Sequence, residues 1–259
     1  MLRYENPLYF AEEAATTDLI SDARLHLGIS RGSPEAALDG QHQFGYHRDQ
    51  GQSWSDYARN TGGRIRQAVS GEPIAHADPE SSWAPVGVDR LRIEPYSSTL
   101  INRLYWGAGS TAWAVWAGEQ GYNLVSSTLL LEDDGRPFHV QQAHQLTEYR
   151  AAYTASGHTT GGQTAVTRSI YVIESAEDKL RYAPISGETD SVGMLDGARA
   201  RSGPTVVGTV DSVAEQLAAD QAVREADLLL VANPNQWGVV ANRRLFASWV
   251  RVFEHLGWK

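Results

Sequence analysis

Three polar turns in this sequence combine residue types that can bind a phosphate group. Ser30-Arg31-Gly32-Ser33 follows the alternating stretch RLHLGI, Gly107-Ala108-Gly109-Ser110 follows an apolar stretch, and Ser126-Ser127 follows another. Glycine lets a backbone approach a ligand closely, arginine keeps its positive charge, and a serine hydroxyl can donate a hydrogen bond. The shared chemistry of the three turns therefore favours a phosphate-bearing ligand.

The turn at residues 107–110 gives the strongest of these signals, because a helix is predicted to begin at Ser110. The first turn of a helix has unpaired N–H groups and a partial positive charge, which suit an anion. Taken singly, each turn has a plainer interpretation: Ser110 as a helix cap, Arg31 as a solvated residue, and Ser126-Ser127 as a loop pair. Their occurrence at the ends of successive strands favours the phosphate site over these alternatives.

The sequence assigns no catalytic residue and no metal site. It has no cysteine, no HExxH, no G-x-S-x-G elbow, and no Walker or G-x-G-x-x-G loop. His139 and His144 are separated by five positions, so they do not share a helical face. His26 is expected to be a hydrogen-bonded histidine of the interior, and His42 and His47 are expected to be solvated loop residues.

Alternating strands and helices must position these turns. Strands are predicted at residues 24–30, 103–109, 122–127, 166–173 and 228–234. Helices are predicted at residues 8–20, 54–70, 110–120, 140–157, 209–226 and 239–257, with an interruption at Gly62-Gly63 in the second. Strands separated by helices pair in parallel, and ligands then bind at the carboxyl ends of the strands. The pattern predicts an α/β fold, with irregular structure at 72–98 and a short helix plus an insertion at 175–208.

The composition argues against several classes of protein. The 259 residues carry a net charge of -9 and no basic cluster, which disfavours binding to nucleic acid. The longest apolar run, residues 104–118, is too short to cross a membrane, and the amino terminus is too acidic for a signal peptide. The absence of cysteine fits a reducing compartment. We therefore expect a cytoplasmic protein with a single domain over residues 1–259.

The segment NPLYFAEEAATTDLISDARLHLGISRGSPE, residues 6–35, resembles the luciferase-like flavin-dependent oxidoreductases, that is, the bacterial luciferase-like monooxygenase family. The resemblance continues through LYWGAGSTAWAVWAGEQGYNLVSS, VQQAHQLTEYRAAY, VGTVDSVAEQLAAD and LLLVANPNQWGVVANRRLF, so it covers nearly the whole chain. It implies a (β/α)8 TIM-barrel fold that binds FMN, or in some branches a deazaflavin, at the carboxyl ends of the strands. It also implies a reaction in which reduced FMN and dioxygen oxygenate a small organic substrate.

Residue by residue, the resemblance implies that Ser30 lies near the flavin ring, Arg31 binds on the phosphate side, and Ser110 with Gly109 holds the phosphate. Ser126 and Ser127 are weaker matches to the family pattern. Together with the turns themselves, this predicts eight cofactor-binding residues: Ser30, Arg31, Gly107, Ala108, Gly109, Ser110, Ser126 and Ser127.

Members of the family have strands before the helix that begins at Asn6-Pro7, so an N-terminally shortened barrel with about five parallel strands is expected. The leading functional interpretation is a flavin-dependent monooxygenase. The alternatives are a shortened flavin-binding protein without turnover and a fragment with a misassigned start. The expected partners are a small-molecule substrate, a flavin reductase and further copies of the chain in a homo-oligomer, with no nucleic acid and no membrane.

Overall fold

The computed structural model describes residues 2–32, 39–83, 85–185, 191–195, 198–233 and 237–258. Ser33 of the first polar turn and Pro234 of the last predicted strand lie outside these residues. The chain divides into two compact units, Met1–Gly107 and Ala108–Lys259, and each is described by itself. The single domain expected over residues 1–259 stays a prediction.

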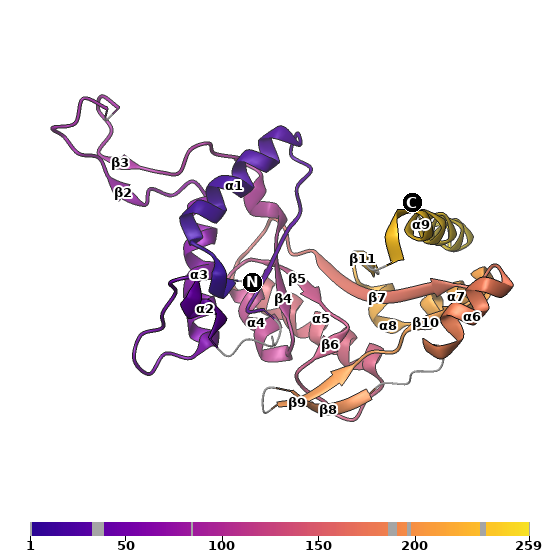
Figure 1. Cartoon of the computed structure of the whole chain (residues 1–259). Coiled ribbons are helices and arrows are strands. Elements are labelled where there is room, and N and C mark those ends of the chain that lie inside the picture. Colours follow the sequence, from indigo (N-terminus) through magenta and orange to yellow (C-terminus); the bar gives the residue numbers. More distant parts are fainter. Residues whose placement is uncertain are drawn as a thin grey trace. The chain divides into compact units, whose positions relative to one another are not determined.

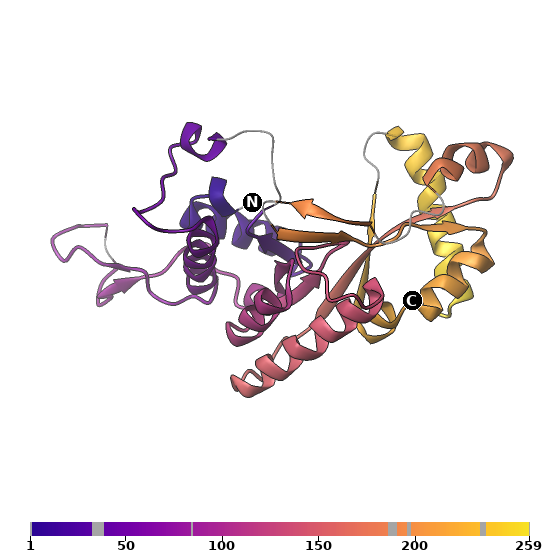
Figure 2. The ribbon, with the colours of Figure 1, turned by 90° about the horizontal axis from the view of Figure 1, so that it is seen from below.

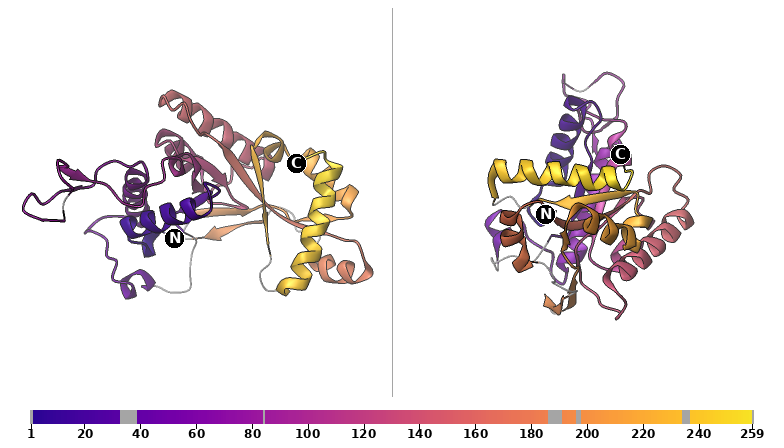
Figure 3. Two further views of the ribbon diagram at one scale, coloured as in Figure 1. Left: turned by 90° about the horizontal axis from the view of Figure 1, so that it is seen from above. Right: turned by 90° about the vertical axis from the view of Figure 1, so that its right-hand side faces the viewer.

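The first unit contains two parallel strands and two long helices (Figure 1). Strand β1 (Leu27–Ser30) pairs in parallel with β4 (Leu104–Ala108), and helix α1 (Pro7–Ile20) packs against α3 (Trp54–Val69). The shorter elements are η1 (Leu2–Tyr4), α2 (Gly40–Gln43), β2 (Ala75–His76), β3 (Arg90–Leu91) and η2 (Leu100–Arg103). Strands β2 and β3 form an antiparallel pair in the stretch expected to be irregular, and this hairpin projects away from α1 and α3 (Figure 3).

Helix α3 runs through both glycines at which an interruption was expected, so that expectation was wrong. Ser53 caps the helix by accepting a hydrogen bond from the Asp56 N–H group at 3.0 Å. Each glycine costs roughly 1 kcal/mol relative to alanine in a helix. Burial of one apolar face offsets that cost, and its residues are Ala58, Ile65, Ala68 and Val69.

Strand β1 begins at Leu27, three residues later than predicted. The backbone before it is bound by side chains instead of a neighbouring strand: the Leu25 N–H group donates to Asp18 at 3.2 Å, and the Leu25 carbonyl accepts from Arg103 at 3.1 Å. His26 is exposed, which corrects its expected interior position, although its ring is hydrogen-bonded to the Tyr105 hydroxyl at 3.2 Å.

The second unit is built around the long strand β7 (Thr164–Val172). Strands β5 (Asn123–Ser126) and β11 (Leu228–Ala232) pair in parallel with its first part, and β10 (Val206–Gly208) pairs in parallel with its last three residues. The helices of this unit are α4 (Thr111–Glu119), α5 (Phe138–Ala155), α6 (Ala176–Tyr182), α7 (Val210–Ala219), α8 (Gln221–Glu225) and α9 (Gly238–His255). Helices α4 and α5 lie side by side (Figure 2), and α9 packs on α7 (Figure 3).

Two expectations for this unit were wrong. The helix predicted at 209–226 is two helices, because Asp220 leaves the helical conformation at φ -73° and ψ 111°. Its carboxylate accepts a hydrogen bond from the Val223 N–H group at 2.9 Å and binds the buried Arg168, so it caps α8. Strand β11 was expected to be buried, yet its residues are half-buried or exposed, with Leu230 41% exposed.

The insertion expected near residues 175–208 holds α6, η3 (Ala183–Ile185) and two antiparallel strands, β8 (Ser191–Leu195) and β9 (Ala198–Ser202). Strand β9 also pairs with β6 (Leu129–Leu130). All five predicted strands are present, and the parallel α/β fold class is confirmed. Within the described residues, no helix combines the length and apolar character needed to span a bilayer.

Candidate functional site

Ser30 and Gly107 are brought together in the first unit, at the carboxyl ends of their strands. They are direct partners in the parallel register of β1 and β4. A Cβ atom at Gly107 would lie 3.1 Å from the Ser30 Cβ atom, so a side chain there would crowd the serine. The Ser30 hydroxyl oxygen accepts a hydrogen bond from the Gly32 N–H group at 3.2 Å. Gly32 has a φ of +101°, which favours glycine at this turn.

The strand that carries Ser30 is fixed at its start by the buried Asp18. This carboxylate accepts hydrogen bonds from the Ser97 hydroxyl at 2.6 Å and from two Arg103 nitrogens at 2.8 and 3.0 Å. Burial by itself would raise the pKa of Asp18, but the hydrogen bonds from Arg103, Ser97 and Leu25 outweigh it and hold the pKa below its usual range. The ionised Asp18 therefore anchors the chain that leads into the first turn.

Ser110 lies where the sequence predicts, at the N-cap of α4 in the second unit. Its hydroxyl oxygen accepts a hydrogen bond from the Trp113 N–H group at 3.4 Å. The preceding Gly109 is covered by a second segment, because its carbonyl accepts a hydrogen bond from the Leu131 N–H group at 2.6 Å. A Cβ atom at Gly109 would touch the Leu131 side chain at 3.4 Å. The predicted phosphate-binding turn is thus closely packed against Leu131.

A carboxylate of the chain itself is bound at this helix start. Glu132 accepts a hydrogen bond from the Thr111 N–H group at 2.8 Å and another from the Thr111 hydroxyl at 2.7 Å. Sequence reasoning missed Glu132, because it lies 21 residues from Thr111 and no local motif joins them. The first turn of α4 thus holds a carboxylate of the chain itself, as the N–H groups and the dipole of a helix start allow.

Ser126 and Ser127 make contacts within the chain that fix the end of β5. Ser126 is fully buried, and its hydroxyl oxygen accepts a hydrogen bond from the Gln142 side chain at 3.0 Å. The same amide donates to the Ser127 carbonyl at 2.7 Å, and the Ser127 hydroxyl accepts from the Leu129 N–H group at 3.0 Å. This geometry gives both serines a structural role, and their part in binding a cofactor stays a prediction.

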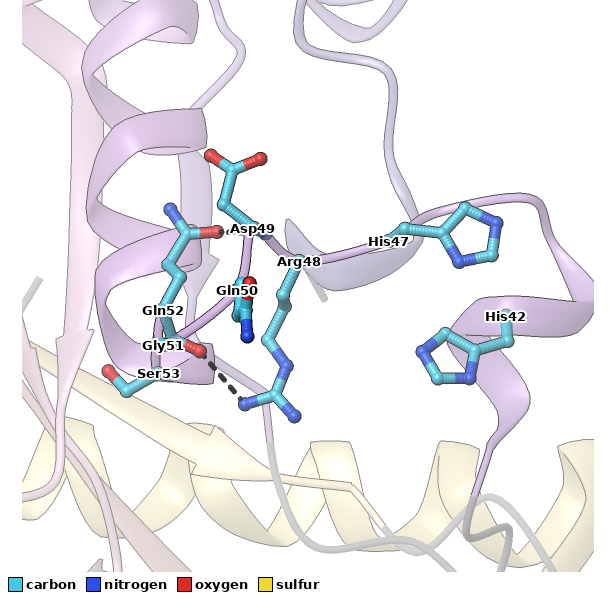
Figure 4. Close-up of a pocket in the computed structure, with 8 residues that line it drawn as sticks. All are labelled: His42, His47, Arg48, Asp49, Gln50, Gly51, Gln52 and Ser53. Atoms are coloured by element: carbon cyan, nitrogen blue, oxygen red, sulfur yellow. Dashed lines mark hydrogen bonds between the residues drawn. The ribbon is translucent and has the colours of Figure 1, made fainter.

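A separate cavity of about 580 Å³ lies in the loop between α2 and α3 (Figure 4). Its lining residues are His42, His47, Arg48, Asp49, Gln50, Gly51, Gln52 and Ser53. The two histidine rings stack with centroids 5.2 Å apart, and both residues are exposed as expected, although His42 lies in α2 and not in a loop. In the part of the chain that the structure describes, no group of three or more His, Asp or Glu side chains is arranged to hold a metal ion.

Each unit therefore contributes part of the predicted set. The first contains Ser30, Arg31 and Gly107, of which Arg31 is half-buried directly after β1. The second contains Ala108, which is 2% exposed, and the turn that follows it. The contact with a carboxylate, that of Glu132, lies at the start of α4 in the second unit.

Neither a family model nor a curated protein sequence matches the chain. Solved structures do match it over almost its whole length. The apo form of MsnO8 has a TM-score of 0.64 and 17% identity, over 98% of this chain and 76% of MsnO8. The oxygenating constituent of 3,6-diketocamphane monooxygenase from Pseudomonas putida, solved in complex with FMN, has a TM-score of 0.62 and 14% identity, over 97% and 75%.

A third similar structure is an F420-dependent secondary alcohol dehydrogenase, with a TM-score of 0.60 and 10% identity, over 97% of this chain and 74% of the dehydrogenase. Identities this low establish a shared fold. The resemblance inferred from the sequence is confirmed at that level, and the chain has the fold of the luciferase-like flavin-dependent oxidoreductases.

Proposed function

We propose that the chain is a flavin-dependent oxidoreductase of the monooxygenase type, which uses reduced FMN and dioxygen on a small organic substrate. The observation that carries the proposal is the anion-binding start of α4, directly after β4, in a chain with this fold. Ligands of parallel α/β folds bind at the carboxyl ends of the strands. The predicted phosphate seat, Gly107 to Ser110, lies at such an end and leads into that helix start.

The residues present fit the phosphate of FMN. The first turn of α4 already binds a carboxylate, and Ser110 adds a hydroxyl at the same turn. We also propose, as the family resemblance implies, that Arg31 binds on the phosphate side with its permanent positive charge and that Ser30 lies near the flavin ring. Reduced FMN, when bound, would supply the two electrons needed to activate dioxygen, and the chain's own groups would hold and orient the cofactor. No side chain is assigned a catalytic proton transfer.

A deazaflavin is the alternative cofactor, supported by the F420-dependent dehydrogenase among the similar structures. A deazaflavin enzyme would transfer a hydride and would not consume dioxygen. The second functional alternative, flavin binding without turnover, predicts cofactor affinity with neither reaction. Titration with FMN and with F420 identifies the cofactor. Oxygen uptake with an added flavin reductase, measured above the uptake of the reductase and FMN alone, separates turnover from binding without turnover.

The proposed partners are the substrate, a flavin reductase that supplies reduced FMN, and further copies of the chain. Support for a homo-oligomer comes from exposed apolar side chains on α9, namely Val239, Val240, Phe246 and Val250. Apolar groups grouped on one exposed helix are typical of protein interfaces.

The decisive experiment is an FMN titration of Ser110→Ala. Loss of a charge-assisted hydrogen bond costs roughly 1.5–3 kcal/mol, so FMN affinity should fall about tenfold or more. Thr209→Ala is the matched control, because Thr209 caps α7 in the same way, with its hydroxyl oxygen 3.3 Å from the Ser212 nitrogen. Unchanged FMN affinity in Ser110→Ala, or an equal loss of affinity in both variants, would show that the phosphate of FMN does not bind at this turn.

A further inference from the structure

The carboxylate of Glu132 occupies the position that the proposed function gives to a phosphate. It accepts two hydrogen bonds from Thr111, one from the N–H group and one from the hydroxyl, at 2.8 and 2.7 Å. Helix α4 spans nine residues, and the N–H groups of its first turn give this end a partial positive charge. The bound carboxylate shows that a negatively charged group of the chain itself is accommodated there.

The backbone around Glu132 is held in place from both sides. The Leu131 N–H group donates to the Gly109 carbonyl at 2.6 Å, and the Gln141 amide donates to the Glu132 carbonyl at 3.2 Å. The next residue, Asp133, is an almost fully buried carboxylate that binds Arg201 at 3.1 Å. The backbone of Glu132 is therefore fixed next to α4. The carboxylate can leave the helix start only if the side chain of Glu132 rotates.

Two anions cannot share this position. Like charges at hydrogen-bonding distance repel each other, and the repulsion is stronger at the surface of a protein than in bulk water. A phosphate that approached the Thr111 N–H group would meet the Glu132 carboxylate, which accepts from both Thr111 donors. Binding of the phosphate thus requires the carboxylate to leave.

We propose that Glu132 is a specificity-determining residue of the phosphate site, an internal anion that the phosphate of the cofactor must displace. The proposal rests on the proposed function, because it takes the start of α4 as the phosphate seat. The affinity of the chain for a phosphate-bearing ligand then depends on how readily the phosphate replaces the Glu132 carboxylate. The fold alone does not determine this property. A ligand without a phosphate gains nothing from that exchange.

The test is titration of Glu132→Gln with FMN and with riboflavin, which lacks the phosphate. Removing the negative charge should tighten FMN binding about fivefold or more, and should leave riboflavin binding unchanged. Glu148→Gln is the matched control, since it removes the same charge from a half-exposed position on α5. Glu132→Asp keeps the charge but shortens the side chain, and is expected to show an intermediate gain.

The outcomes separate this proposal from the one on which it rests. Tighter FMN binding in Glu132→Gln, with weaker binding in Ser110→Ala, supports both. If Ser110→Ala binds FMN more weakly while neither Glu132→Gln nor Glu132→Asp binds it more tightly, the result supports the phosphate site at the start of α4 and overturns the role of Glu132. If neither Ser110→Ala nor Glu132→Gln changes the affinity, the phosphate seat itself is wrong. An equal gain in Glu148→Gln, or an equal gain for riboflavin, would assign the effect to net charge and also overturn the proposal.

Discussion

Arg31 follows the last residue of β1 and is proposed to neutralise the phosphate of the cofactor. A guanidinium offers a planar fork of donors, whereas a lysine ammonium is a point charge. Arg31→Ala should therefore lower FMN affinity about tenfold, and Arg31→Lys should recover only part of that loss. Arg64→Ala, at an exposed position of α3, is the control for a lost positive charge. Equal FMN affinity in all of these variants and the unaltered chain would exclude Arg31 from the site.

Asp18 is a second single residue with a measurable effect, because it makes the stability of the folded chain depend on pH. Its pKa is lowered in the folded chain by Arg103 and Ser97, against burial, so the folded state favours the ionised carboxylate. This contribution is complete above the unfolded pKa of about 3.9 and is lost as the pH falls through the lower folded value. Asp18→Asn should cost about 3 kcal/mol at pH 7, because Arg103 loses its buried partner.

Urea denaturation at pH 7 and at pH 3 measures this effect. The unaltered chain should lose more stability than Asp18→Asn between pH 7 and pH 3, because the variant has no carboxylate at position 18 to protonate. Asp89→Asn, at an exposed position, should match the unaltered chain at both pH values. Identical pH dependence in Asp18→Asn and the unaltered chain would contradict the assignment.

Helix α4 depends on a glycine for its contact with α5. A Cβ atom at Gly118 would lie 2.7 Å from the Tyr149 carbonyl oxygen and 3.0 Å from the Tyr153 nitrogen, both backbone atoms of α5. Gly118→Ala should therefore destabilise the unit by about 1–2 kcal/mol, because overpacking exceeds the gain in helix propensity.

Gly63→Ala in α3 is the matched comparison for this element. Gly63 is exposed and has open space where a Cβ atom would be placed, so the same change should stabilise the chain by about 1 kcal/mol. Thermal unfolding of the two variants measures the difference. A higher melting temperature for Gly118→Ala would show that α4 and α5 can move apart enough to admit a methyl group without a loss of stability.

At the scale of the whole molecule, the chain is expected to associate with further copies of itself. One side of α9 packs through Leu245, Trp249 and Val252, while the exposed Phe246 and Val250 lie on another side. Covering those exposed groups with a second copy removes apolar surface from water. Light scattering after size-exclusion chromatography should therefore report a mass above that of one chain.

Val250→Lys should shift that mass toward the monomer, because a charge on the associating surface must lose water. Leu180→Lys, at an exposed apolar position on α6, should leave the mass unchanged. A single monomeric species from the unaltered chain, at concentrations where FMN binds, would contradict the expected homo-oligomer.

Local signals in the sequence determined the order of strands and helices, the parallel α/β class, and several helix ends. Asn6 before Pro7 and Ser110 each cap a helix, because a cap uses the side chain and the N–H groups of residues two or three positions away. The placement of Ser30 and Gly107 at the carboxyl ends of their strands likewise follows from the strands that the sequence predicts. These features depend on neighbours along the chain or on the regular geometry of a sheet.

Tertiary structure decided the features that depend on side chains from distant segments. Arg103 and Asp18 bind the backbone at Leu25 and shorten β1, and Arg168 binds Asp220, which ends one helix and caps the next. Glu132 reaches the start of α4 across 21 residues and occupies the anion-binding turn that the sequence had predicted. A pattern of residues can indicate that a helix start will attract a negative charge, but only the folded chain determines which negative charge comes within hydrogen-bonding distance.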